Sequence, residues 1–358
     1  MRKALIAAVS LGSGVALAAQ SPTYGLTVAY RLQDAVTGVT TTDYGRVFVL
    51  YPHLDGAAGI RIAELGSDGT PRPYPDSRWN DWKPGDDPAK SFLGTNSLRI
   101  GPDGRLWVVD TGTRGFGAQV IPHGAKLIAI NVKTNTVERV YPLETAITPT
   151  SYVDDVRFNK SHAYLTDAGT PGIIVLDLGS GSTRRVLDHD KSTTAQVPVS
   201  ASGSTLVANQ KPVRINADQL EISPDRKWFY YQPACGPLYR IETRYLDDPR
   251  ISAEELSRNA KLWVKTPSTG GTAMDAQGNI YLSDVNARRI LKITPAGVTT
   301  TLLKDTRLDW VDAMWIDKKG TLWMPTAQLD RLPMFHAGKS QLKLPVVIYT
   351  TELGVRPE

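Results

Sequence analysis

The chain has 358 residues and a formal net charge of +5, with 41% hydrophobic and 22% charged residues, values that exclude general disorder. Because the charge is small and no run of Lys or Arg occurs, we expect no nucleic-acid partner. Cys235 is the only cysteine, which excludes intrachain disulfides and thiolate zinc clusters.

The first segment, residues 1–19, has the features of a secretory signal. Arg2 and Lys3 precede an apolar run that ends in small residues near Ala18. The run is too short to span a membrane, and no later segment reaches about 18 apolar residues, so we expect no membrane insertion. The sequence therefore predicts a secreted or periplasmic protein whose folded part is residues 20–358.

A short strand-like segment, preceded by a turn residue, recurs six times at intervals of roughly 40 to 65 residues. In chain order these segments are 45–51, 104–110, 161–167, 226–232, 278–284 and 320–326. The apolar stretches that follow them are 59–75, 126–143, 172–188, 237–246, 289–303 and 342–350. This recurrence is typical of propeller blades, and it predicts an all-β, six-bladed β-propeller that forms a single domain.

Two other segments complete the expected elements. Residues 26–32 precede the first unit and are expected to close the last blade, which would remove an open sheet edge. Residues 253–259 are expected to form a short helix of at most two turns.

Alignment of the six units on their turns places one residue of each unit at the start of the innermost strand. These residues are Thr37, Asn96, Asp154, Asp218, Gly270 and Asp312. The third unit needs a one-residue gap, so Asp155 can take the place of Asp154. Because innermost strands line the central channel, we expect the six residues to converge near one end of the axis.

Three carboxylates and one amide in a narrow channel need a compensating partner. Like charges raise one another's pKa, or a hard cation neutralises them. Calcium or another hard divalent cation, held by a ring of oxygen ligands, is one expectation, with the ligands Asn96, Asp154, Asp218 and Asp312. The alternative is that these side chains only cap backbone amides at the strand starts.

A different repeat position, at the end of the second strand, also carries aspartate. Asp110, Asp167 and Asp284 occupy it in three units. Because the position recurs, we expect these side chains to hold the turns that follow them rather than to bind a ligand.

Several segments resemble the yellow/major royal jelly protein family over nearly all of the mature chain. They include LWVVDTG (106–112), VDDVRF (153–158), LEISPDRKWFYYQP (220–233) and WVDAMWIDKKGTLWM (310–324). The resemblance implies a secreted six-bladed propeller. Family members include insect proteins linked to dopachrome conversion, salivary proteins that bind biogenic amines in the central tunnel, and nutritive proteins.

A more distant resemblance is to the gluconolactonase/senescence-marker superfamily of lactone hydrolases, which hold a divalent ion on the axis. Asn96 and Asp218 match two of that superfamily's ligand positions. Thr37 stands where the superfamily has a glutamate, and Gly270 where it has an aspartate. These two differences argue against lactonase chemistry by the same mechanism.

Three functions are therefore open at this point. The first, which the family resemblance favours, is binding of a small cyclic or aromatic molecule, with isomerisation of it by a carboxylate acting as general base. The second is metal-dependent hydrolysis of a lactone or ester. The third is a non-catalytic scaffold that binds a protein partner. For the first function the candidate catalytic residues are Asp154, Asp218 and Asp312, and the candidate ligand contacts are Asn96, Asp155, Trp310, Trp79 and Trp82.

Overall fold

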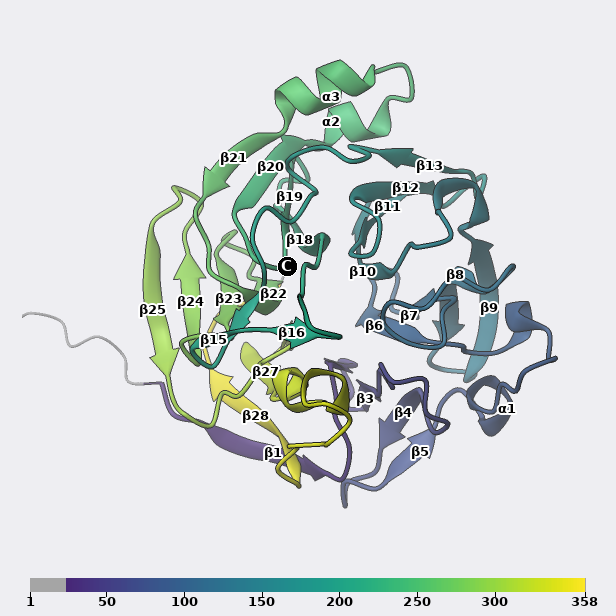
Figure 1. Ribbon diagram of the computed structural model, residues 1–358, viewed down its shortest axis with the longest axis vertical. Coiled ribbons are helices and arrows are strands. Elements are labelled where there is room, and N and C mark those ends of the chain that lie inside the picture. The colour runs from purple at the N-terminus through teal and green to yellow at the C-terminus, as the bar shows by residue number, and fades with distance from the viewer. Residues whose placement is uncertain (1–23, 358) are drawn as a thin grey trace, which may run out of the picture.

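The computed structural model describes residues 24–357, and the predicted signal at residues 1–19 lies outside this part. In the described part, six four-stranded antiparallel sheets are arranged around a central axis (Figure 1). This arrangement confirms the predicted all-β, six-bladed propeller.

The blades follow one another in chain order. Blade 1 contains β2 (Gly38–Thr41), β3 (Val47–Leu50), β4 (Ile62–Leu65) and β5 (Pro71–Pro73). Blade 2 contains β6 (Thr95–Ile100), β7 (Leu106–Thr111), β8 (Ala125–Asn131) and β9 (Thr136–Pro142). Blade 3 contains β10 (Val153–Asn159), β11 (His162–Asp167), β12 (Gly172–Asp177) and β13 (Thr183–Val186). Blade 4 contains β18 (Ala217–Ile222), β19 (Trp228–Pro233), β20 (Leu238–Glu242) and β21 (Lys261–Val264). Blade 5 contains β22 (Thr269–Met274), β23 (Ile280–Asp284), β24 (Arg289–Ile293) and β25 (Thr299–Lys304).

The sixth blade joins the two ends of the described chain. It contains β26 (Trp315–Ile316), β27 (Thr321–Pro325) and β28 (Val346–Glu352), and β1 (Thr27–Leu32) adds the outer strand. The pairing of β1 with β28 runs from Thr27 opposite Thr350 to Leu32 opposite Val346. The predicted closing strand is thus confirmed, and its hydrogen bonds cover an edge that would otherwise be open.

The repeated segments of the sequence are the second strands of the blades, and they are buried because the blades stack face to face. All six residues of β7 are buried. The ring of Trp107 lies 4.8 Å from that of Phe158 in the next blade, with an interplanar angle of 48°. Such aromatic contacts add to the aliphatic side chains that fill the core between blades.

Helices are short and lie at the edges of the propeller. They are α1 (Ser77–Asn80), α2 (Thr243–Asp247) and α3 (Ala253–Asn259), with the 3-10 turns η1 (Pro88–Lys90) and η2 (Glu144–Ala146). Helix α3 matches the predicted segment 253–259, and it begins where the Ser252 side chain accepts a hydrogen bond from the Glu255 N–H at 3.2 Å. Over residues 24–357, none of the helices has the length and apolar character needed to cross a membrane.

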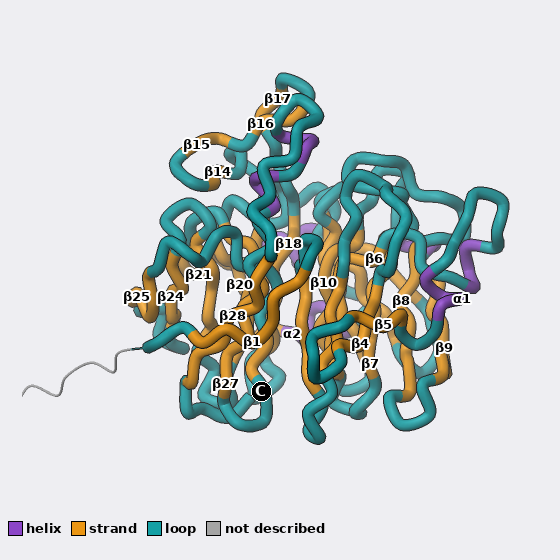
Figure 2. The backbone as a smooth tube through the Cα atoms, turned by 90° about the horizontal axis from the view of Figure 1, so that it is seen from below, coloured by secondary structure: helices purple, strands orange, loops and turns teal. Residues whose placement is uncertain are grey.

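An insertion that the sequence did not predict covers one end of the axis. It consists of the hairpins β14 (Ser200–Ala201) with β15 (Ser204–Thr205), and β16 (Val207–Ala208) with β17 (Lys211–Pro212). Figure 2 shows these hairpins projecting beyond the blades on one side. The turns η3 (Leu329–Arg331) and η4 (Pro333–Phe335) pack beside them, and we call the hairpins and these turns the cap.

Candidate functional site

The six residues aligned from the sequence line one small cavity on the axis. Asn96, Asp154, Asp218 and Gly270 lie near the starts of β6, β10, β18 and β22. Thr37 directly precedes β2, and Asp312 lies three residues before β26. The repeat therefore identified the inner end of every blade.

The wall of this axial cavity also includes apolar side chains from loops and from the cap. The additional lining residues are Leu54, Phe116, Tyr152, Ala168, Ile215, Thr269, Trp310 and Leu329. Phe116 meets Tyr152 edge to face, with 5.2 Å between the ring centroids. The sequence predicted Trp310 as a ligand contact but gave no signal for Phe116, Tyr152, Ile215 and Leu329, because the loops that carry them differ between blades and follow no repeat.

Hydrogen bonds link the polar side chains of the axial cavity. The Asn96 amide donates to Asp154 Oδ1, and the Asn96 carbonyl oxygen accepts from the Tyr152 hydroxyl at 3.0 Å. Asp312 accepts from Trp310 Nε1 at 3.0 Å and from the Ala313 N–H at 2.9 Å. Each polar group therefore has a fixed orientation toward the axis.

All three carboxyl groups of the cavity have a raised pKa. Burial raises the pKa of Asp154 well above its usual value, and the nearby Asp218 carboxylate raises it further. Burial, together with Asp312, raises the pKa of Asp218 to about 7, although its hydrogen bond with Asp154 lowers it in part. The pKa of Asp312 is also raised, mainly by burial and further by Asp154. Near neutral pH the Asp154–Asp218 pair therefore shares a proton.

Asp155, the alternative to Asp154, lies outside the axial cavity lining. The register of β10 shifts between Val153 and Val156. Asp155 instead accepts hydrogen bonds from Ser97 and, at 2.6 Å, from Arg157 Nη1. Burial alone would raise the pKa of Asp155, but Arg157 and Arg99 lower it below its usual value. In this structure Asp155 is an ion-pair partner of Arg157 and Arg99, and its role as a ligand contact stays a prediction.

Two further candidates for stacking on a ligand lie far from the axis. Trp79 belongs to α1 and packs on Phe92, with 5.1 Å between the ring centroids. Trp82 donates from Nε1 to the Asp86 carbonyl oxygen at 3.4 Å. Of the three tryptophans, only Trp310 lines the axial cavity.

The aspartates at the ends of the second strands have the predicted structural role. Asp110 accepts from the Leu93 N–H at 2.9 Å and from Lys126 Nζ at 2.7 Å, and both charged side chains are buried. Asp167 accepts from the Tyr152 N–H at 2.9 Å and thereby helps to place Tyr152 in the cavity wall. Asp284 pairs with Arg289 Nε at 2.8 Å.

The oxygen atoms of the ring residues are not free to point at a cation on the axis. Asn96 turns its amide nitrogen to Asp154, and both oxygens of Asp312 accept N–H groups. Among residues 24–357, no group of three or more His, Cys, Asp or Glu side chains is arranged to hold a metal ion. Calcium prefers six to eight oxygen ligands. This conformation does not fit calcium, and the calcium ring stays a prediction that requires the Asn96 amide to turn over.

Comparison with solved structures finds propellers of the same architecture. A gluconolactonase from Xanthomonas campestris is 11% identical, with a TM-score of 0.57 over 93% of this chain and 90% of that chain. A putative gluconolactonase is 10% identical, with a TM-score of 0.58 over 93% of each chain. A luciferin-regenerating enzyme is 11% identical, with a TM-score of 0.58 over 94% of this chain and 98% of that one. At this identity the likeness shows the fold alone.

Comparison by sequence is more specific. A search of curated proteins finds no match. The family model described as major royal jelly protein matches residues 94–355, which include blades 2 to 5, three of the four strands of blade 6, and five of the six ring positions, Asn96 to Asp312. The chain belongs to the major royal jelly protein family.

Proposed function

We propose that the axial cavity binds the amine of a small cyclic or aromatic molecule, and that its carboxyl groups move a proton on that molecule. The observation that carries this proposal is the convergence of Asp154, Asp218 and Asp312 in a cavity walled by Tyr152 and Trp310. A protonated amine supplies the positive charge that three adjacent carboxyl groups lack. The family resemblance supports the same ligand class.

The size of the axial cavity limits how such a molecule can bind. Its volume is about 70 Å³, less than half of the roughly 150 Å³ of a cavity that holds benzene. The cavity therefore admits an ammonium head group, while the ring of the ligand lies toward the cap, against Phe116 and Trp310. Aromatic side chains favour a bound cation and a bound ring through their faces.

Proton transfer needs one group that takes a proton and one that returns it. The Asp218 carboxylate, with a pKa of about 7, is matched to the role of base near neutral pH. Asp154 retains a proton and can donate it to a second atom of the ligand. Transfer between Asp218 and Asp154 then restores the starting state, so the net reaction is a tautomerisation without a co-reactant.

Substitution of Asp154 tests the binding step. Titration calorimetry of the folded protein with tryptamine and dopamine is expected to show binding, and the neutral isosteres indole-3-ethanol and 4-ethylcatechol are expected to bind more weakly. In Asp154→Asn the amines should bind about tenfold more weakly, because the Asp154–Asp218 pair, which shares one proton and carries one negative charge, loses one of its two carboxyl groups. The matched control is Asp81→Asn, which removes an exposed carboxylate paired with Lys83. Absence of binding across the aromatic amines would overturn the proposal.

Substitution of Asp218 tests the chemical step. Loss of the general base should slow the conversion of dopachrome, followed by its absorbance, by about 100-fold or more. The Asp218→Asn variant should still bind amines through Asp154 and Asp312. Equal rates for the variant and the unaltered chain would remove Asp218 from the mechanism.

Truncation of one cap side chain tests the placement of the ring. Leu329 lines the cavity from η3, so Leu329→Ala opens space where the ring is proposed to lie. We expect the preference for tryptamine over the smaller phenethylamine to rise by about tenfold, the range that one or two methylenes supply in an apolar pocket. The control is Leu344→Ala, at an exposed leucine outside the cavity lining. An unchanged preference would place the ring elsewhere.

A calcium-dependent lactone hydrolase is the second candidate, and the convergence of an amide with three carboxyl groups favours it. Calcium would be held by Asn96, Asp154, Asp218 and Asp312 after the Asn96 amide turns over, and it would polarise a substrate carbonyl. Under this alternative, lactone hydrolysis appears with calcium and is abolished by a chelator. Amine binding that is indifferent to the chelator supports the first proposal instead.

Both proposals place the protein outside the cytoplasm, on the evidence of the N-terminal segment. Amino-terminal sequencing of protein recovered from the periplasm or the medium should begin near residue 20. Recovery of the intact N-terminus from the cytoplasm alone would contradict this placement.

A further inference from the structure

Within residues 24–357, one buried hydroxyl in the wall of the axial cavity is left without a hydrogen bond. It belongs to Thr37, which lines the cavity and is 4% exposed, and whose Oγ1 atom is buried with no partner. None of the other residues described in the cavity wall has a buried polar side-chain atom of this kind. Because an unpaired buried hydroxyl costs free energy, this atom indicates a binding partner from outside the chain.

The main chain holds Thr37 at the junction of blades 1 and 6. Its N–H donates to the Leu50 carbonyl oxygen at 3.1 Å, and its own carbonyl oxygen accepts from the Ala313 N–H at 3.0 Å. The next residue, Gly38, forms a β-bridge with Ala313. Thr37 therefore lies beside Asp312, and its hydroxyl is the group of this residue that the fold leaves unused.

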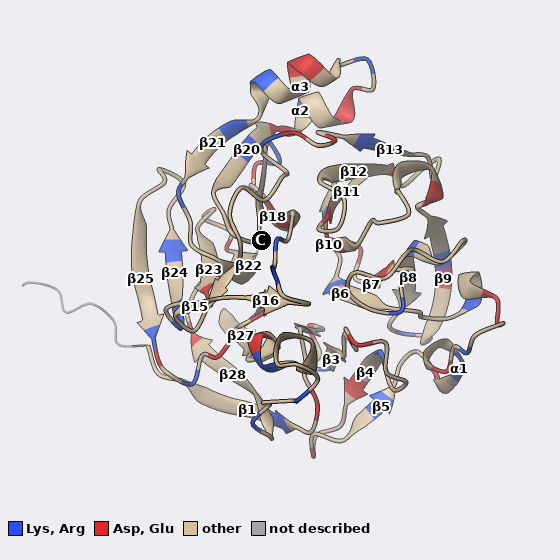
Figure 3. Cartoon of the chain, viewed as in Figure 1, with Lys and Arg blue, Asp and Glu red and all other residues tan. Residues whose placement is uncertain are grey.

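The polar groups of the ring are distributed unevenly around the axis. Asp154 and Asp218 come from blades 3 and 4. Figure 3 shows charged residues on the inner strands β10 and β18, whereas β22 of blade 5 carries none and has Gly270 at its ring position. Blades 3 and 4 lie opposite blades 6 and 1 (Figure 1), so the Asp154–Asp218 pair faces Thr37 and Asp312 across the axis.

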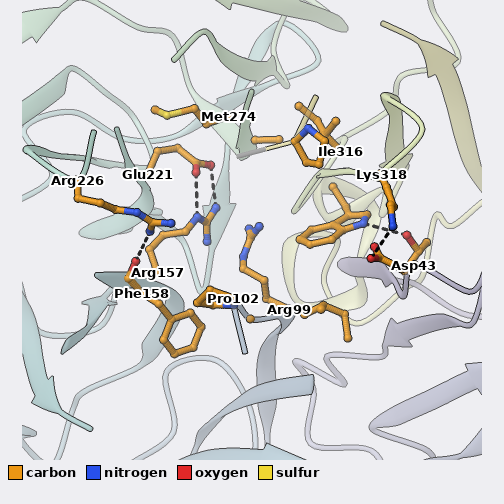
Figure 4. A pocket seen from close by; sticks show the side chains of 16 residues that line it. Asp43, Arg99, Pro102, Arg157, Phe158, Glu221, Arg226, Met274, Ile316 and Lys318 are labelled. Atoms are coloured by element: carbon orange, nitrogen blue, oxygen red, sulfur yellow. Dashed lines mark hydrogen bonds and ion pairs between the residues drawn. The ribbon is translucent and has the colours of Figure 1, made fainter. Parts of the chain in front are cut away.

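A cluster of paired charges lies further along the channel, away from the cap. Arg157 donates to Glu221 from Nη2 at 2.7 Å and to Asp155 from Nη1 at 2.6 Å, and we call these three residues the Arg157 cluster. Figure 4 shows the Arg157–Glu221 pair in the wall of a second pocket, which shares no lining residue with the axial cavity. The Arg157 cluster separates the two, so a ligand reaches Thr37 from the cap side.

An ammonium group on the axis can use the Thr37 hydroxyl in one way only. The ammonium group has N–H donors and no acceptor, so Thr37 Oγ1 accepts from it. A primary ammonium carries three N–H donors. The cavity offers three acceptors, which are the Asp154–Asp218 pair, Asp312 and Thr37. A tertiary ammonium has a single N–H, which a carboxylate takes in preference to a hydroxyl because that hydrogen bond joins opposite charges.

We propose that Thr37 makes the axial cavity selective for primary amines, by accepting one N–H of the bound ammonium group. This inference rests on the proposed function, since it names the class of amine that the same cavity prefers. Positive charge alone does not distinguish a primary from a tertiary ammonium, whereas the number of N–H donors does. Thr37 therefore determines specificity within the amines.

The test compares two amines that carry the same charge and differ in their N–H groups. Titration calorimetry of the folded protein at neutral pH should show phenethylamine binding at least about tenfold more tightly than N,N-dimethylphenethylamine. In Thr37→Val, which keeps the shape of the side chain, affinity for phenethylamine should fall about tenfold, while affinity for the dimethyl amine should change less than about twofold. Thr37→Ser, which keeps a hydroxyl, should retain the preference for the primary amine.

A matched control comes from a second hydroxyl of the same kind. Thr351 in β28 also has a buried Oγ1 without a hydrogen bond in the described chain, but it lies outside the cavity lining. Thr351→Val should leave both affinities unchanged. Because valine removes an unpaired hydroxyl, both valine variants should melt at or above the temperature of the unaltered chain.

Two results would overturn the assignment of Thr37 alone. One is an unchanged affinity for phenethylamine in Thr37→Val, and the other is an equal fall for both amines, which a purely structural effect would produce. Failure of the proposed function gives a different result, in which neither amine binds the unaltered chain, and that result would overturn both.

Discussion

Replacement of Asp218 by asparagine is expected to raise the free energy of unfolding at pH 8 by about 2–4 kcal/mol, and to leave it nearly unchanged at pH 4. In the unfolded chain an aspartate ionises near pH 4. In the folded protein the pKa of Asp218 is about 7, because of burial and of Asp312. Between these values the unfolded chain has released a proton that the folded protein keeps, so the stability of the unaltered chain falls as pH rises through this window. Because an asparagine side chain does not titrate, the Asp218→Asn variant does not lose stability through this group.

Urea denaturation across pH 4 to 8 measures this effect, with Asp81→Asn as the exposed control. The control should change stability by less than about 1 kcal/mol at any pH. If the unaltered chain and Asp218→Asn lose stability in parallel from pH 4 to 8, the negative charge of Asp218 is compensated by a positive charge in the folded state. Repetition with added calcium and with a chelator then identifies whether a cation provides that compensation. The same substitution is expected to abolish turnover, so stability and activity change in opposite directions at this position.

The largest loss of stability is expected for Arg157→Met, at about 3–5 kcal/mol near neutral pH. Arg157 is buried and hydrogen-bonded to Asp155 and to Glu221, which is itself buried. Methionine preserves much of the side-chain volume but leaves Glu221 without the guanidinium of Arg157, and leaves Asp155 with the more distant Arg99 at 3.8 Å. Glu221 retains a hydrogen bond from Thr272 at 2.8 Å, which cannot replace a positive charge.

A double-mutant cycle separates this charge effect from packing. Glu221→Gln in the Arg157→Met background removes one uncompensated carboxylate and should restore part of the lost stability. Lower pH should also favour the Arg157→Met variant relative to the unaltered chain, because Arg157 lowers the pKa of Asp155 and the unaltered chain loses that stabilisation as pH falls. A cost below about 1 kcal/mol for Arg157→Met would show that the cluster is solvated and does not hold the channel together.

The sequence predicted the blades and the ring because both depend on a repeat. One position in each unit begins an innermost strand, and closure of the propeller brings those positions together. The choice between Asp154 and Asp155 was not predictable, because the third unit aligns only with a one-residue gap and the register shifts at this point in blades 2 to 5. The walls of the axial cavity were not predictable either, since Phe116, Ile215 and Leu329 lie in connections of unequal length.

A second level of residues along the axis could have been predicted from the same alignment. Positions three residues after the ring positions include Arg99, Arg157 and Glu221, from blades 2, 3 and 4, and Trp315, from blade 6. Because residues along an inner strand descend the channel, this second set marks a deeper level of the axis. The alignment located the level, but only the folded structure shows that Arg157 binds both Glu221 and Asp155 there.

The pairing of β1 with β28 has a consequence for the order of folding. These strands are separated by most of the chain, yet they are neighbours in one sheet. As the polypeptide is made, β1 emerges early and has no edge to join until β28 arrives, so the sixth blade is completed last. Bringing β1 to β28 costs the entropy of closing a long loop before the two strands form any stabilising contact. This pairing is therefore slow relative to the formation of the local hairpins. A partly made ring exposes unpaired strand edges during that interval, when association with other chains competes with closure.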